Sequence, residues 1–204
     1  MVWNATTLAN VHGILKVPSG DTSIDAQIND LIAAVSLRAE NYIGRSFEQV
    51  ERTETYDIGR RTRAVFLKNW PVDTTATFEV RNNVQRDFTV SEMSSTLCAI
   101  SANTGRLYFV SSLVTGPEVL QVKYTGGLAA NEAALQGIED LEYAVRRQVA
   151  HEYNRRNSPG AKKSVGGRAS TSIQGEGELG WLKGTREVMD SYRSIWTKSP
   201  GSLR

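Results

Sequence analysis

The glycine-rich segment 175–180, with the sequence GEGELG, has the G-x-G-x-x-G spacing that binds a pyrophosphate in dinucleotide-binding proteins. In those proteins the glycines lie between a hydrophobic strand and a helix. Here a stretch rich in Ser and Gly precedes the segment, and Glu176 and Glu178 would place negative charge beside a phosphate. The pattern therefore predicts no nucleotide site, and we expect the glycines to supply backbone flexibility.

The segment HEYNR (151–155) begins like the HExxH helix of zinc proteases, but an arginine occupies the position of the second histidine. The other histidine is His12, and the single cysteine, Cys98, offers no second thiol for a zinc site or a disulfide. We expect His151 to be a partly buried helix residue and Cys98 to be a small apolar residue in a strand. Because no acid–base or nucleophile pair stands out, the sequence predicts no catalytic residue, no metal, no cofactor and no enzyme.

Positive charge is concentrated in residues 146–168, although the net charge of the whole chain is only +2. The basic residues there are Arg146, Arg147, Arg155, Arg156, Lys162, Lys163 and Arg168. With Glu152 as the one acid, the local net charge is +6, and such a cluster can bind phosphates without reading bases. The two arginine pairs lie about two and a half helical turns apart, on different faces. Two explanations of the cluster remain open. It contacts a nucleic-acid backbone, or it is a solubilising surface followed by a mobile loop.

Large aromatic side chains gather near the C-terminus, at Trp181, Tyr192 and Trp196. Trp and Tyr are frequent anchors of protein interfaces. Packing on the chain's own core is the simpler explanation of the same residues.

Helices are predicted where apolar residues recur at steps of three and four. The clearest runs from 23 to 43, with Thr22 and Asp25 as a capping box and Gly44 just past its end. Three further helices are predicted at about 8–15, 132–156 and 185–197.

Residues 47–125 contain short β-branched and aromatic runs separated by turn residues, which predicts a mainly antiparallel sheet. Residues 157–180 predict a flexible, basic Gly/Ser-rich arm, and 181–204 a C-terminal helix and tail. The predicted fold is α+β: a small helical bundle of two long helices plus N- and C-terminal helices, with an inserted β subdomain. We expect one domain over 1–204, soluble and without a signal peptide or a membrane-spanning segment.

Five segments of the chain, taken in order, resemble the head-tail connector proteins of tailed bacteriophages, also called adaptor or head completion proteins. They are DAQINDLIAAVSLRAENYIGRSF (25–47), FLKNWPV (66–72), TGRLYF (104–109), VKYTGG (122–127) and EDLEYAVRRQVAHEYNRR (139–156). The resemblance extends over residues 8–156, and its specificity comes from the order and spacing of the segments together.

The resemblance implies a structural virion protein with no catalytic activity. Such a subunit assembles into a ring, dodecameric in this family, beneath the portal protein. The ring extends the DNA channel and supports the next neck or tail protein. The implied location is the virion neck at the head–tail interface, after assembly in the host bacterial cytoplasm, with no membrane and no cofactor involved.

Within such a ring we expect two groups of contacts. The residues expected to face packaged double-stranded DNA, without sequence preference, are Lys162, Lys163 and Arg168. The residues expected to contact the portal or another partner are Trp181, Tyr192, Trp196, Lys198 and Arg204. The alternative is a sequence-independent DNA-binding module acting alone, whose monomer would bind duplex DNA in a salt-sensitive way.

Overall fold

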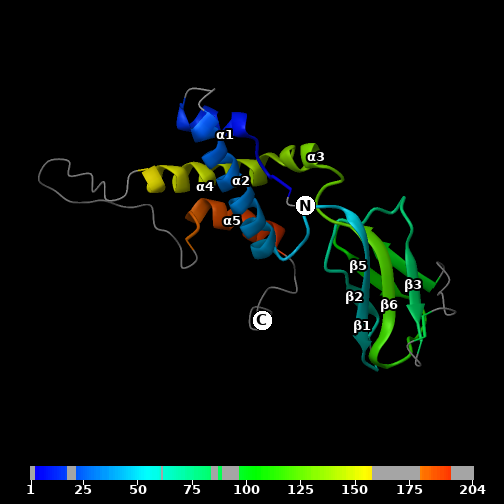
Figure 1. Cartoon of the computed structure of the whole chain (residues 1–204). Helices are drawn as coiled ribbons and strands as arrows, with labels where there is room; N and C mark the ends of the chain where they lie inside the picture. The colour runs from blue at the N-terminus through cyan, green and yellow to red at the C-terminus, as the bar shows by residue number, and fades with distance from the viewer. Residues whose placement is uncertain are drawn as a thin grey trace, which may run out of the picture. The chain divides into compact units, whose positions relative to one another are not determined.

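The computed structural model describes residues 3–17, 22–60, 62–83, 87–88, 97–157 and 180–193 (Figure 1). The chain divides into two compact units. The helical unit comprises Met1–Gly44 and Glu132–Arg204, and the β unit comprises Arg45–Asn131, which contains the predicted insert 47–125. The predicted combination of helices with a mainly antiparallel sheet is confirmed.

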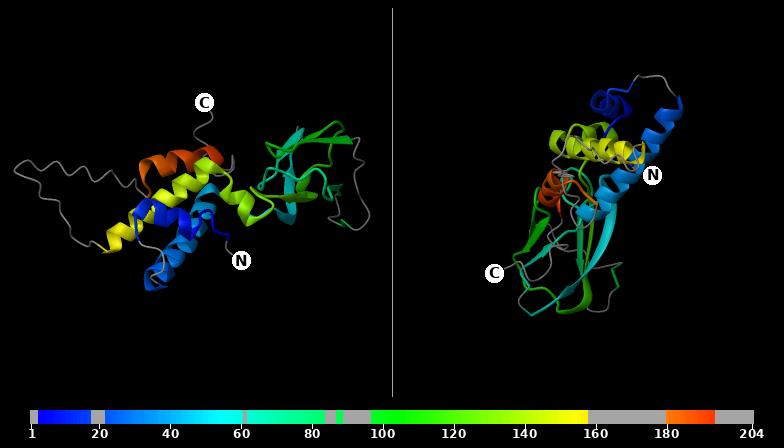
Figure 2. Two further views of the ribbon diagram at one scale, coloured as in Figure 1. Left: turned by 90° about the horizontal axis from the view of Figure 1, so that it is seen from above. Right: turned by 90° about the vertical axis from the view of Figure 1, so that its left-hand side faces the viewer.

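The described helices all belong to the helical unit. They are α1 (Leu8–Leu15), α2 (Thr22–Ile43), α3 (Glu132–Gln136), α4 (Glu139–Asn157) and α5 (Lys183–Tyr192). Helix α4 is central, because α1, α2 and α5 all pack against it (Figure 2). Within the described ranges, no helix combines the length and the apolar character needed to cross a bilayer.

Helix α2 forms where the apolar spacing predicts it. Its buried side chains follow the three- and four-residue steps: Ile28, Leu31, Ile32, Val35, Ser36, Ala39 and Ile43. Gly44 ends the helix as expected, with a φ of 70° and an N–H that donates to the carbonyl oxygen of Glu40 at 3.0 Å. The predicted capping box is not found, because Thr22 already lies within the helix and Asp25 pairs instead with His12 at 2.9 Å.

The single long helix predicted for 132–156 is wrong, because the chain turns at Gly137 and Ile138 between α3 and α4. The N–H of Gly137 donates to both Ala133 and Ala134, and that of Ile138 donates to Leu135 at 3.1 Å, which closes a tighter turn than an α-helix. Glycine is a poor helix former, which favours a break here.

The last helix is also shorter than predicted. It starts at Lys183 and ends at Tyr192, because the backbone of Arg193 is extended, with φ −64° and ψ 135°. The remainder of the predicted helix, from 194 onward, lies outside the described residues.

The β unit contains two three-stranded antiparallel sheets in its described part. One has the order β1 (Val50–Ile58), β6 (Gly116–Gly126), β3 (Glu79–Asn82), and the other β2 (Ala64–Phe66), β5 (Arg106–Phe109), β4 (Cys98–Ser101). Both sheets contribute to one hydrophobic core, in which Leu67, Leu107, Leu120, Val122 and Tyr124 are fully buried. Cys98 lies half-buried in β4 as predicted, and burial raises the pKa of its thiol.

Two adjacent glycines at the end of β6 allow close backbone contacts. A Cβ on Gly126 would lie 2.1 Å from the carbonyl oxygen of Asn69, and one on Gly127 would lie 2.2 Å from that of Glu48. No side chain fits at either position, which gives a physical reason for the Gly-Gly pair in the segment VKYTGG.

Candidate interaction surfaces

The start of α5 is held by the side chain of Gln148, which is fully buried in α4. Its Nε2 donates to the carbonyl oxygen of Gly180 at 3.0 Å and to Glu152 at 2.9 Å. Its Oε1 accepts the N–H of Leu182 at 2.9 Å. One amide therefore satisfies backbone groups on both sides of Trp181, where the chain enters α5.

Trp181 belongs to the core of the helical unit, with 2% of its surface exposed. Its ring lies 6.1 Å from that of Tyr42 on α2, and the guanidinium of Arg38 lies 4.2 Å from its centroid. A side chain that is already buried has no surface left for a partner. The structure thus assigns Trp181 to internal packing, which was the simpler of the two explanations, instead of to the expected portal contact.

Polar bonds attach the rest of α5 to α2 and α4. The hydroxyl of Thr185 donates to the carbonyl oxygen of Ala144 at 3.1 Å, and that of Tyr42 donates to Asp190 at 2.7 Å. Tyr192, half-buried, donates to Asp140 at 2.6 Å. Trp196, Lys198 and Arg204 lie outside the described residues.

A basic pocket of about 360 Å³ lies at the C-terminal end of α4. Its lining residues are Arg38, Glu152, Arg155, Arg156 and Gly180. Arg38 forms an ion pair with Glu152, which offsets one of the three positive charges. Among the described residues, the lining of this pocket thus comprises three arginines and one glutamate, and guanidinium groups are well suited to bind phosphate oxygens.

The predicted basic cluster is divided by the structure. Arg146 is half-buried, pairs with Glu142 at 3.6 Å and lies 5.3 Å from the ring centroid of Tyr143. Among the described members of the cluster, Arg155 and Arg156 line the basic pocket, and Arg146 and Arg147 do not. Lys162, Lys163 and Arg168, predicted to face DNA, lie outside the described residues, as does GEGELG apart from Gly180.

A cluster of ionisable groups in the β unit surrounds Glu54 on β1. Its carboxylate accepts hydrogen bonds from the hydroxyls of Tyr56 and Tyr124, the latter at 2.7 Å. Burial, and then the hydrogen bond to Glu54, raise the pKa of Tyr56, while burial and then the charge of Glu54 raise the pKa of Tyr124. Both phenols therefore stay protonated as donors, so the cluster is a structural one, without an activated nucleophile.

His151 is partly buried in α4, as the sequence predicts. Among the described residues, no group of three or more His, Cys, Asp or Glu side chains could hold a metal ion.

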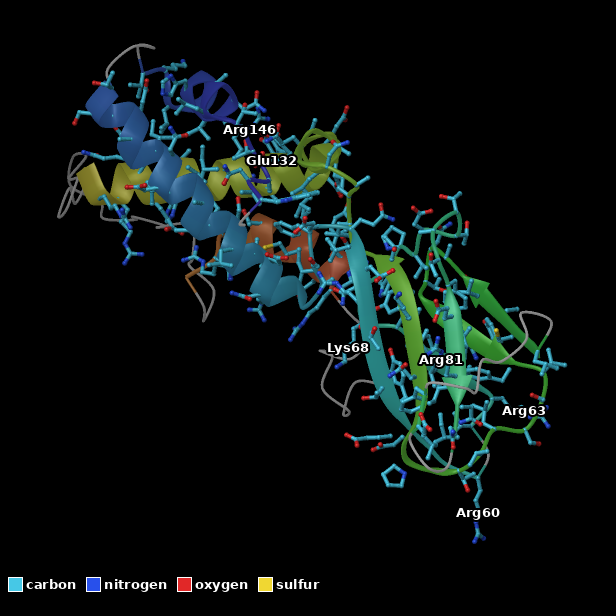
Figure 3. The ribbon with its side chains drawn as sticks, turned by 45° about the vertical axis from the view of Figure 1, so that its right-hand side comes forward. Arg60, Arg63, Lys68, Arg81, Glu132 and Arg146 are labelled. Atoms are coloured by element: carbon cyan, nitrogen blue, oxygen red, sulfur yellow. The ribbon has the colours of Figure 1, made fainter. Side chains whose placement is uncertain are left out.

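Two arginines that the sequence reasoning did not single out lie in the turn between β1 and β2. Arg60 and Arg63 are exposed and line a second pocket of about 400 Å³ (Figure 3). The run Arg60-Arg61-Thr62-Arg63 was the available signal, because three arginines in four residues stand out in a turn.

Comparisons with known proteins give one family match and several structures of similar fold. The family model described as "Head completion protein" matches residues 5–195. No curated protein matches the chain. A chain in the virion of a native gene transfer agent particle is 15% identical, with 94% of this chain and 90% of that chain covered and a TM-score of 0.54. A chain in the neck of an empty gene transfer agent particle, computed with C6 symmetry, is 16% identical over the same coverage, with a TM-score of 0.53.

Proposed function

Because the chain belongs to the head completion protein family, a family of structural virion proteins, we propose that it forms a ring in the virion neck that joins the portal to the next neck or tail protein. The match over residues 5–195 carries this proposal. It extends beyond the five segments that resemble connector proteins and includes α5. The ring is homo-oligomeric and surrounds the DNA channel.

One structural relative supports a ring. A chain of the same fold occupies the neck of a gene transfer agent particle computed with C6 symmetry, which requires several copies around one axis. A dodecamer, implied by the connector resemblance, is compatible with that symmetry. A subunit that repeats around DNA multiplies each weak contact, so even two arginines per copy give a strongly basic ring.

The DNA-facing surface in this proposal is the basic pocket together with the segment that follows α4. Arg156 precedes residues 158–179 and Gly180 follows them, and both line the basic pocket. Lys162, Lys163 and Arg168 lie in the sequence between these two lining residues. These cations bind phosphates without reading bases.

Portal attachment is assigned to the chain that follows α5, with Trp196, Lys198 and Arg204, and to Tyr192. Gln148 and Trp181 hold α5 in place, so this tail leaves from a fixed helix. A fixed starting point reduces the conformational entropy that the tail loses when it docks.

Deletion of residues 197–204 tests this assignment, because it leaves every described contact of α5 intact. The shortened chain should keep its thermal unfolding transition and lose binding to the portal encoded in the same genome, measured by co-sedimentation. Replacement of 197–204 by a Gly/Ser stretch of equal length is the matched control for chain length. Retained portal binding by the shortened chain would contradict the assignment.

The basic pocket also favours one alternative function, a sequence-independent DNA-binding module that acts as a monomer. The two functions differ in solution. The alternative requires tight, salt-sensitive binding of duplex DNA by the free monomer, whereas a ring subunit needs only weak contacts in each copy.

A further inference from the structure

The end of the β unit that contains the turn between β1 and β2 carries an exposed basic and apolar surface that the DNA and portal contacts leave unused. We call it the β-tip surface, and it comprises Arg60, Arg63, Leu97, Val110 and Ser112. Val110 is 78% exposed and Leu97 is 37% exposed. Arg60 projects away from the ribbon (Figure 3).

Backbone hydrogen bonds bring these residues together from separate parts of the chain. The N–H of Phe109 donates to the carbonyl oxygen of Arg63 at 2.9 Å, and that of Val110 donates to Leu97 at 2.9 Å. Gly59 and Thr62 close the turn through two bonds of 3.1 Å. The arginines and the apolar side chains are therefore presented by a fixed framework.

The charge of this surface is not neutralised within the described chain. Neither Arg60 nor Arg63 pairs with a carboxylate of the described residues, and the described residues that line their pocket include hydroxyls and no acid. Exposed arginines beside an apolar group fit a protein partner that offers a carboxylate and an apolar side chain together. Duplex DNA would leave Val110 and Leu97 without apolar contacts.

The first two turns of α4 offer such a pair. Glu139 is exposed and has no partner among the described residues, and Tyr143 is 49% exposed. Four residues separate them, so both lie on one face of the helix. Arg146 and Arg147 lie near the same ring, 5.3 and 5.7 Å from its centroid, but one turn further along α4. Acidic residues therefore lie at the N-terminal end of α4, and the arginines lie further along the helix.

We propose that the β-tip surface of one copy binds the start of α4 of a second copy, with Arg60 and Arg63 on Glu139 and with Val110 on Tyr143. The two surfaces differ and belong to different units of the chain, so the contact is head-to-tail. Repeated head-to-tail contacts close into a ring when the rotation permits it. This inference rests on the proposed ring and names the surfaces that connect its subunits.

Photocross-linking in assembled particles tests the contact. The chain carries p-benzoylphenylalanine in place of Val110, and cells that produce the particle are irradiated after assembly. Mass spectrometry of purified particles then identifies the attached peptide. A covalent dimer with the attachment in 139–147 supports the proposal. The same group in place of the exposed Thr53 on β1 gives the background level.

Three outcomes would overturn it. They are attachment to a different protein, attachment to DNA, and no attachment above the Thr53 background in particles that contain the chain. Failure of the proposed function looks different, because purified particles would then lack the chain altogether.

Charge reversal supplies the matched test. Arg63→Glu should lower the cross-linked dimer about tenfold, because it places two carboxylates together. Adding Glu139→Arg to the same chain should restore the dimer. The control is Glu187→Arg, which changes an exposed acid on a different helix, α5, and should not restore the dimer. Equal dimer in Arg63→Glu and wild type would also overturn the proposal.

Discussion

Gln148→Met tests how the structure holds α5. Methionine has nearly the same volume as glutamine, so the substitution removes three hydrogen bonds without opening a cavity. It leaves the carbonyl oxygen of Gly180 and the N–H of Leu182 without their partner. The N–H of Leu182 is buried, and an unsatisfied buried group costs about 1–3 kcal/mol, whereas the half-buried carbonyl of Gly180 adds less. Detachment of α5 returns both groups to water, so the loss appears as local opening of 181–192.

Hydrogen–deuterium exchange measures this opening directly. In Gln148→Met, amides in 181–192 should exchange at least about tenfold faster, since about 1.4 kcal/mol corresponds to a factor of ten. Gln27→Met, on the exposed face of α2, is the matched control and should leave exchange in 181–192 unchanged. If Gln148→Met stays folded with wild-type exchange there, Gln148 does not hold α5 and the reasoning is refuted.

Three further predictions concern other parts of the chain. Gly126→Ala should lower the free energy of unfolding by about 3 kcal/mol or more in urea titrations, because the added Cβ would lie 2.1 Å from a backbone carbonyl oxygen; a decrease below about 0.5 kcal/mol would contradict this. The free energy of unfolding should fall above pH 10, because tyrosines of the unfolded chain ionise near 10.0 while Tyr56 and Tyr124 stay protonated in the folded state. Replacing both tyrosines by Phe should reduce that fall. The same pH dependence in this variant and in the wild type would contradict the prediction. Arg155→Gln with Arg156→Gln should weaken binding to duplex DNA and reduce the slope of log K against log salt by about 0.9 for each phosphate that the two arginines neutralise; an unaltered slope would exclude these arginines from binding DNA.

Elements with a strong local signal were predictable from the sequence. The apolar steps of α2 and the glycine after it indicated both the buried face and the end of that helix. The break at Gly137 was missed because Leu135, Ile138 and Leu141 keep the spacing of one continuous helix. A local pattern of apolar residues does not distinguish a turn of this kind from a helix.

Contacts between distant segments were not predictable in the same way. In the sequence, Gln148 is an ordinary polar residue of a helix. Its burial and its hydrogen bond to Gly180 depend on a segment that lies far from it in the sequence. From the sequence, Trp181 suited both an interface and a core, with the core the simpler explanation, since its burial depends on where α2 and α5 meet. The strand order β1-β6-β3 likewise depends on pairings between residues that lie far apart in the sequence, such as Val50 with Gly126, which no short segment specifies.

Stoichiometry on the portal is the measurement that tests the central claim most directly. The purified full chain is mixed with the portal protein encoded in the same genome, and the product is weighed by native mass spectrometry. A portal complex that carries a full ring of copies, twelve in the dodecameric case implied by the connector resemblance, is the predicted result. Absence of any portal complex, together with tight salt-sensitive binding of the monomer to duplex DNA, would contradict the neck-ring account.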